Sequence, residues 1–175
     1  MNTSICIGLV NPKSPTNVGS VMRAAGCYGA QSVSYTGERY NRAARFHTDT
    51  KSAASRIPLL PVEDILCNLA ADVKVVCVEL VEGATALPSF EHPEKALYVF
   101  GPEDGSLEQT LIDRADSVIY IPTIGCMNLA ATVNVVLYDR LAKSVYAAGS
   151  DQLIRDSRDA NNRVRVKASI PADNR

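Results

Sequence analysis

The segment that decides the fold is "IPTIGCMNLAATVNVVLYDRL", residues 121–141. It starts at the end of an apolar run, crosses an uncharged turn that holds Cys126, and enters a helical pattern that extends from Asn128 to about Ala147. Apolar side chains recur along one face of this pattern, at Leu129, Val133, Val136 or Leu137, and Leu141. A strand that leads into a helix is typical of α/β domains. The turn leaves two readings open: a nucleophilic Cys126, or a site that holds a ligand whose chemistry lies elsewhere.

The rest of the chain repeats this alternation of strand and helix. Short apolar runs rich in β-branched residues predict strands buried on both faces, as in a parallel sheet, at residues 5–10, 74–81, 96–101 and 117–122. Helical patterns are predicted at residues 17–29, 62–71 and 107–115. We therefore expect an α/β domain whose mainly parallel sheet is sandwiched by helices.

Ligands of such sheets bind at loops that follow the carboxyl ends of strands. Three loops of this kind stand out: "NPKSPTN" (11–17), "GPEDGS" (101–106) and "TIGCMN" (123–128).

The length and composition of the chain limit its possible domain organisation and location. A chain of 175 residues suits one domain, here residues 1–149, and the polar residues 150–175 are expected to form a mobile tail. Eighteen basic and nineteen acidic residues give a formal charge of −1, so any contact with nucleic acid requires local clustering of basic residues. No apolar run approaches the ~20 residues of a membrane span, and the N-terminus lacks a secretory pattern, which predicts a cytoplasmic protein.

The cysteines give little support for metal or nucleophilic chemistry. Five are scattered without a CxxC pair, four of them in apolar stretches, which predicts reduced, buried thiols and no metal site. A nucleophile elbow needs small residues on both sides and a histidine base. Gly125 precedes Cys126, but Met127 follows it, and the only histidines, His47 and His92, lie in polar segments. A thiol packed in a turn is favoured over a cysteine hydrolase.

A loop and a helical segment contain further candidate site residues. Glu103 and Asp104 in "FGPEDGSL" are carboxylates of one turn, which on composition alone is more typical of an ordinary turn than of a site. Arg23 stands within an otherwise apolar helical face. Such an arginine is costly unless it is paired or faces an anion. The alternative is a side chain that extends to the surface from the helix edge.

A basic segment after the second predicted strand interleaves cations with Tyr40 and Phe46. Its cations are Arg39, Arg42, Arg45, Lys51 and Arg56. This mixture suits binding of a phosphate backbone and stacking on an unpaired base. A solvated helix face is the alternative, but the position near the ligand-binding edge of the sheet favours RNA.

Taken together, three segments resemble the motifs of the SpoU/TrmH family of RNA ribose 2'-O-methyltransferases, a branch of the SPOUT superfamily. They are "NVGSVMRAAGCYGA" (17–30), "YVFGPEDGSL" (98–107) and "IPTIGCMNLAATVNVVLYDRL" (121–141), within a similarity that extends from Ile5 to Tyr146. The resemblance implies a homodimer, a C-terminal deep trefoil knot and S-adenosylmethionine as cofactor. It places the cofactor near Glu79, Gly101, Ile121, Cys126, Met127 and Leu129.

The resemblance also implies roles in catalysis, which it assigns to Asn17, Arg23, Glu103 and Asn128. The implied reaction transfers a methyl group to a ribose 2'-hydroxyl of tRNA or rRNA, with the tRNA anticodon loop weakly favoured. Cys126 and Ala130 replace serines of many members. The alternative is therefore a knotted RNA-binding dimer that has lost methyl transfer.

Overall fold

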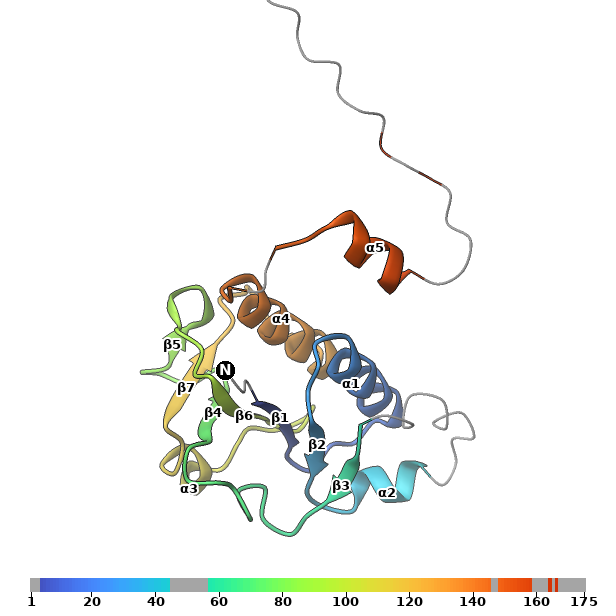
Figure 1. Cartoon of the computed structure of the whole chain (residues 1–175). Helices are drawn as coiled ribbons and strands as arrows, with labels where there is room; N and C mark the ends of the chain where they lie inside the picture. Colours follow the sequence, from blue (N-terminus) through green and yellow to red (C-terminus); the bar gives the residue numbers. More distant parts are fainter. Residues whose placement is uncertain (1–3, 45–56, 146–147, 159–163, 165, 167–175) are drawn as a thin grey trace, which may run out of the picture. The chain divides into compact units, whose positions relative to one another are not determined.

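The computed structural model describes residues 4–44, 57–145, 148–158, 164 and 166. The chain divides into two units, Met1–Ser144 and Val145–Arg175. The first unit contains a seven-stranded sheet in the order β3-β2-β1-β6-β4-β7-β5, and every strand pair in it is parallel (Figure 1). The strands are β1 (Ser4–Leu9), β2 (Ser32–Tyr35), β3 (Leu59–Pro61), β4 (Lys74–Val78), β5 (Thr85–Ala86), β6 (Lys95–Phe100) and β7 (Ser117–Tyr120).

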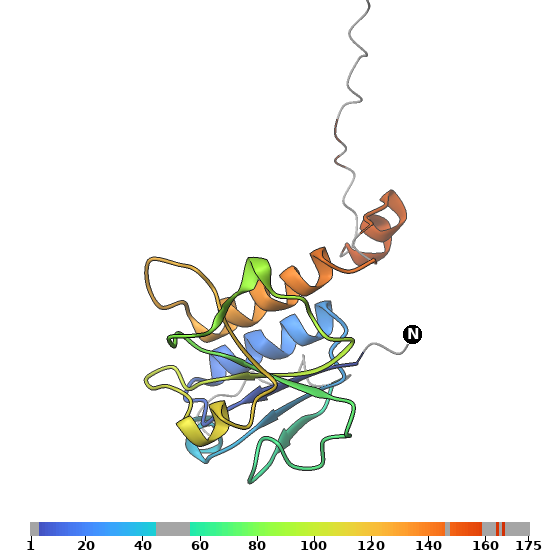
Figure 2. The same cartoon turned by 90° about the vertical axis from the view of Figure 1, so that its left-hand side faces the viewer.

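Helices cover both faces of this sheet. Helices α1 (Pro15–Cys27) and α4 (Leu129–Ala142) lie side by side on one face (Figure 2). Helix α3 (Gln109–Ile112) packs on the other face, and α2 (Arg39–Ala44) follows β2. A 3₁₀ turn, η1 (Leu87–Ser89), precedes β6. The predicted α/β fold with a parallel sheet is confirmed.

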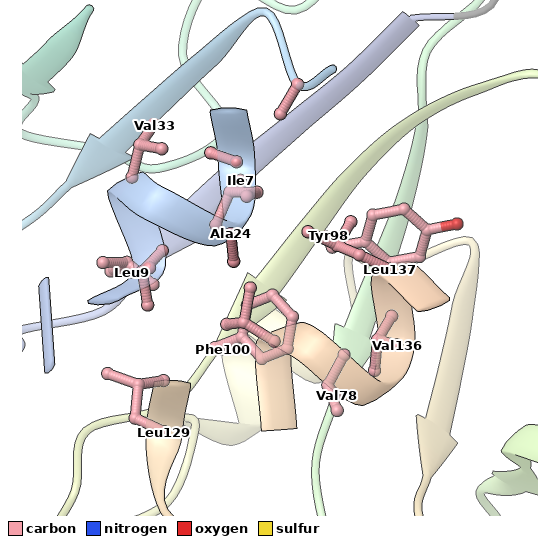
Figure 3. Packing of buried hydrophobic residues seen from close by; sticks show 14 of the residues in the cluster. Ile7, Leu9, Ala24, Val33, Val78, Tyr98, Phe100, Leu129, Val136 and Leu137 are labelled. Atoms are coloured by element: carbon pink, nitrogen blue, oxygen red, sulfur yellow. The ribbon is translucent and has the colours of Figure 1, made fainter. Parts of the chain in front are cut away.

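The alternation of side chains along each strand builds two apolar layers. In β6, Tyr98 and Phe100 point toward α1 and α4, where they pack with Val136 and Leu137 (Figure 3). The intervening Leu97 and Val99 belong to the layer on the opposite face. Because both faces of the central strands are covered, their sequences read as continuous apolar runs.

The two long helices begin at residues that cap their free backbone N–H groups. Ser14 caps α1 by accepting a hydrogen bond from the Asn17 N–H, and Pro15 occupies the first helical position. The Asn128 side chain caps α4. The uncharged turn before α4 thus ends at a residue that fixes where the helix starts.

The prediction of a helix at residues 62–71 is wrong. This segment forms turns, in which the Asp64 side chain accepts a hydrogen bond from the Leu66 N–H and Asn68 adopts a positive φ of 57°. These local bonds compete with a helix. The apolar spacing that suggested a helix arises because Ile65 packs against the sheet at Gly8, where an added Cβ would lie 2.7 Å from Ile65 Cγ1.

A buried polar network that the sequence patterns did not predict fixes the C-terminal half of α4. Arg140 donates hydrogen bonds to the Pro93 and Glu94 carbonyls and to the Tyr98 hydroxyl. His92 lies 2.6 Å from the Tyr98 hydroxyl and 2.9 Å from the Asp139 carboxylate. Burial lowers the pKa of His92, although Asp139 opposes this shift.

The prediction of buried thiols is wrong for most of the cysteines. All five are free, but Cys27, Cys67 and Cys126 are exposed and Cys6 is half-buried. Only Cys77, on β4, is buried, and burial raises its pKa to about 11. Apolar neighbours in sequence did not predict burial because Cys27 lies on the outer side of α1 and Cys67 in a turn.

The second unit contains α5 (Asp151–Ser157), whose first turn is capped by the Ser150 hydroxyl. The polar composition of this region did not predict a helix. In the described part of the chain, no helix has both the length and the apolar content needed to cross a membrane.

Candidate active site

A cavity lies at the carboxyl ends of β4, β6 and β7. It is lined by residues that directly follow these strands and by the first turns of α4: Val78, Glu79, Leu80, Phe100, Gly101, Pro102, Glu103, Gly105, Tyr120, Ile121, Thr123, Cys126, Met127, Leu129 and Thr132. All six residues that the sequence resemblance assigns to cofactor binding are in this lining. The structure therefore brings these candidates together at one edge of the sheet.

Glu79 organises the wall of the cavity. One of its carboxylate oxygens accepts a hydrogen bond of 2.8 Å from the Leu107 N–H, and the other accepts one of 2.9 Å from the Leu80 N–H. Gly101 faces this pair, because a Cβ added there would lie 3.2 Å from Glu79 Oε2 and 3.5 Å from Leu107 N. The absence of a side chain at Gly101 keeps the loop after β6 close to the loop after β4.

A chain of hydrogen bonds links the three loops. The Asn17 amide donates to Glu103 Oε1 over 3.0 Å, and Asn17 Oδ1 accepts from the Asn128 amide over 3.0 Å. Three of the four candidate catalytic residues thus form one connected unit. Asn128 also accepts hydrogen bonds from the N–H groups of Ala130 and Ala131 as the cap of α4.

Glu103 is further fixed by the first loop. The backbone N–H groups of Lys13 and Ser14 donate to its carboxylate over 2.8 Å and 3.0 Å. Partial burial by itself raises the pKa of Glu103, but the hydrogen bonds from Asn17, Lys13 and Ser14 outweigh it and hold the pKa below its ordinary value. Glu103 is therefore an ionised acceptor that joins loops, and it is poorly suited to act as a general acid near neutral pH.

The fourth candidate, Arg23, is not in the lining of this cavity. It is exposed on the outer side of α1, and among the described residues it has no hydrogen-bond or ion-pair partner. Of the two sequence alternatives, the structure shows the exposed position. Its guanidinium is therefore open to an anion.

The basic segment is only partly described. Arg39 binds the Asp104 carboxylate through Nη2, at 2.8 Å and 2.9 Å from its two oxygens. Arg42 forms an ion pair with Glu38. The other predicted RNA-binding residues, Arg45, Lys51 and Arg56, lie outside the described residues. Sequence patterns missed the pairing of Arg39 with Asp104, because the two residues stand 65 positions apart.

The geometry does not support a cysteine hydrolase. Cys126 lines the cavity, but His92 is held by Tyr98 and Asp139 and is not part of the lining. His47 lies outside the described residues. Within residues 4–44, 57–145 and 148–158, no group of three or more His, Cys, Asp or Glu side chains is placed to hold a metal ion.

Several solved structures share this fold at low sequence identity. AviRb, a SpoU methyltransferase from Streptomyces viridochromogenes solved with AdoMet, is 19% identical, with a TM-score of 0.66 over 82% of this chain and 58% of AviRb. An A. aeolicus TrmH/SpoU tRNA modifying enzyme is 16% identical, with a TM-score of 0.66 over 88% of this chain and 85% of that one. A protein described in "Structural insights into the 2-OH methylation of C/U34 on tRNA" is 22% identical, with a TM-score of 0.65 over 82% and 97%.

This chain spans less than two thirds of the length of AviRb and of an rRNA methyltransferase from Sinorhizobium meliloti. No curated protein sequence matches it significantly. The model of the SpoU rRNA Methylase family matches residues 4–138, which include the whole sheet, the cavity and the Asn17–Glu103–Asn128 chain. The protein belongs to the SpoU rRNA Methylase family.

Proposed function

We propose that this protein is an S-adenosylmethionine-dependent RNA methyltransferase that acts on a ribose 2'-hydroxyl of tRNA or rRNA. The observation that carries the proposal is the hydrogen-bonded unit of Asn17, Glu103 and Asn128 beside a cavity lined by all six candidate cofactor residues. Membership of the SpoU rRNA Methylase family supports RNA methylation as the activity. The solved structures support the fold.

The cavity suits a cationic ligand with an apolar ring system. Among the described residues that line it, none is Lys or Arg, whereas Glu79 and Glu103 are carboxylates. Leu80, Ile121 and Leu129 supply apolar surface for an adenine ring. The uncharged turn before α4 offers backbone groups for hydrogen bonds. S-Adenosylmethionine, when bound, supplies an already activated methyl group.

The residues of the chain then act by orientation. Glu103 and Asn17 hold the first loop against the loop after β6, and Asn128 holds the start of α4 in the same unit. Placing a ribose hydroxyl in line with the methyl group contributes on the order of 7–11 kcal/mol to lowering the barrier. No covalent nucleophile is needed, which is why an uncharged turn suffices.

Arg23 acts from the partner subunit of a homodimer in this proposal. Its absence from the lining of its own cavity supports that arrangement. The outer side of α4 exposes Tyr138 and Leu141, which are 62% and 42% exposed, and such apolar side chains suit a subunit interface. A guanidinium has a pKa above ~12 and is a poor base. Arg23 therefore holds the target phosphate and stabilises the developing alkoxide.

The rest of the proposal concerns the topology, the contacts with RNA, the location and the first substrate to test. The C-terminal segment threads into a trefoil knot around the cofactor site, and residues 150–175 serve as a tail of the domain formed by residues 1–149. Arg39 and Arg42, with Arg45, Lys51 and Arg56 outside the described residues, contact RNA. The protein acts in the cytoplasm. Similarity to a protein described for methylation at C/U34 of tRNA supports the anticodon loop as the first substrate to test.

A second candidate function is a knotted RNA-binding dimer without methyl transfer. Cys126 and Ala130 favour it. The thiol of Cys126 in the cavity lining is a weak hydrogen-bond partner, and the side chain of Ala130 in the first turn of α4 cannot form a hydrogen bond. Isothermal titration with S-adenosylmethionine separates the two. Heat of binding supports the methyltransferase, and no heat at millimolar cofactor supports the binding protein.

The role of Arg23 is tested by complementation between two inactive variants. Arg23→Ala lacks the arginine, and Gly101→Leu blocks the cavity. When the two are mixed in equal amounts, half of the dimers are mixed and each has one complete site, so about a quarter of the unmodified activity is expected. A mixture as inactive as its components contradicts the shared site.

A further inference from the structure

The Asp104 carboxylate lies between two cations, one on the loop after β1 and one at the start of α2. Arg39 Nη2 is 2.8 Å and 2.9 Å from its two oxygens, and Lys13 Nζ is 3.5 Å from Oδ2. The hydrogen bond from Arg39 lowers the pKa of Asp104, so this side chain is charged at neutral pH. A carboxylate held by an arginine and a lysine occupies the kind of position that suits a phosphate.

Both cations are placed by rigid parts of the fold. The Lys13 N–H donates to Glu103, which belongs to the hydrogen-bonded unit of the candidate active site. Arg39 is the first residue of α2, and the next residue, Tyr40, is buried. Gly37, with a φ of 74°, packs directly on Asn11, where an added Cβ would lie 2.4 Å from Asn11 Oδ1. The segments that bear Lys13 and Arg39 are therefore fixed against each other.

The pair retains donors for a further anion. Within the described part of the chain, Arg39 is held through Nη2 alone, which leaves Nε and Nη1 open, and the Lys13 contact is long. Lys13, Arg39 and Asp104 together have a net charge of +1, because one carboxylate pairs with two cations. By contrast, Arg42 and Glu38 form a one-to-one pair. The group also borders the cavity, because Glu103 and Gly105 on either side of Asp104 line it.

We propose that Lys13 and Arg39 bind a phosphate of the substrate RNA next to the target nucleotide, and that Asp104 occupies this site as a competing anion in the free protein. This inference rests on the proposed RNA substrate. Asp104 is 49% exposed, and exposed ion pairs contribute little to stability, so a phosphate displaces it at small cost. A nearby carboxylate also makes the site selective, since only an anion that brings further contacts replaces it.

The test compares two substitutions that change the net charge equally. Asp104→Asn removes the competing anion, and Asp72→Asn removes a carboxylate that is paired with Lys95 at the opposite ends of the strands. Affinity for unfractionated tRNA is measured for both variants as a function of salt. We expect Asp104→Asn to tighten binding by about threefold to fivefold and Asp72→Asn to change it by less than about 1.5-fold.

Two further variants localise the effect. Lys13→Ala and Arg39→Ala should each weaken tRNA binding by about threefold to tenfold and reduce the slope of log affinity against log salt by about 1. When Arg39→Ala is already present, Asp104→Asn should have no larger effect than Asp72→Asn. Titration with S-adenosylmethionine should give the same affinity for every variant, which shows that the cavity is intact.

The outcomes separate this inference from the proposed function. If the unmodified chain neither binds tRNA nor methylates RNA, the proposed function is contradicted together with the inference. The phosphate site alone is overturned if the unmodified chain binds tRNA and methylates RNA, but Asp104→Asn changes tRNA affinity no more than Asp72→Asn does. It is also overturned if Asp104→Asn tightens tRNA binding equally in a chain that carries Arg39→Ala.

Discussion

The side-chain amide of Asn128 donates a hydrogen bond of 3.0 Å to the side-chain oxygen of Asn17, a residue 111 positions earlier in the chain. The Asn17 amide in turn donates to Glu103. The direction of this chain is fixed, because turning the Asn17 amide over would place its oxygen against a carboxylate and its nitrogen against the Asn128 amide. The start of α4 and the first loop are thereby held in one geometry.

Asn128 is expected to have two separable functions. Asn128→Ala removes the cap of α4 and should lower the free energy of unfolding by about 1 kcal/mol. Asn128→Asp keeps the acceptor for the helix N–H groups but cannot donate to Asn17. Urea unfolding should therefore show near-normal stability for Asn128→Asp, while methyl transfer by both variants falls by about 10²-fold. Full activity of Asn128→Asp would show that the link to Asn17 is dispensable.

Gly101→Ala should weaken cofactor binding. Its new Cβ would lie 3.2 Å from Glu79 Oε2 and crowd the hydrogen bond between Glu79 and Leu107. Isothermal titration should show an affinity for S-adenosylmethionine that is lower by at least about fivefold, as overpacking by one methyl group costs about 1–3 kcal/mol. Gly125→Ala is the matched control, since a Cβ there meets nothing within 4 Å. Equal effects of the two changes would contradict this account of Gly101.

The contribution of Glu103 should depend on pH. Its folded-state pKa lies below the ordinary value of 4.5, so its stabilising effect is present above the unfolded pKa and is lost as the pH falls through the folded pKa. Glu103→Gln should therefore be less stable than the unmodified chain at pH 7, and the difference should shrink progressively as the pH falls below about 4.5. Urea unfolding across this range measures it, and a difference that does not change with pH would refute the assignment.

Cys126→Ser distinguishes a ligand-binding turn from a nucleophile. A hydroxyl is a better hydrogen-bond partner than a thiol, so cofactor affinity should be kept or increased. Titration calorimetry and methyl-transfer rates check this expectation. Loss of all activity with unchanged cofactor binding would point instead to chemistry at the sulfur.

The sequence predicted those parts of the fold whose signals are local and periodic. The α4 pattern was found because its apolar residues face the sheet, and the expected start at Asn128 is the residue that caps the helix, although α4 ends at Ala142 and not near Ala147. Residues 62–71 show the limit of this reasoning. A turn that packs Ile65 onto Gly8 has the same apolar spacing as a helix, and only the tertiary contact distinguishes them.

The candidate site was predictable only as a set of loops. That the loops after β1, β6 and β7 meet followed from a parallel sheet, and the motif resemblance named the residues. The individual hydrogen bonds between these loops could not be predicted from the sequence. The bonds from Asn17 to Glu103 and from Arg39 to Asp104 join distant segments, and neither leaves a trace in local composition. The buried Arg140 was missed for the same reason, because its acceptors are backbone carbonyls of another segment.

The most direct measurement is a methyl-transfer assay with the purified chain, isotope-labelled S-adenosylmethionine and either tRNA or rRNA, followed by mass spectrometry of the digested nucleosides. The account predicts label on the ribose 2'-oxygen of one nucleotide, in amounts that fall sharply for Asn128→Asp. Label on a base, or no transfer under conditions in which the cofactor binds, would contradict it.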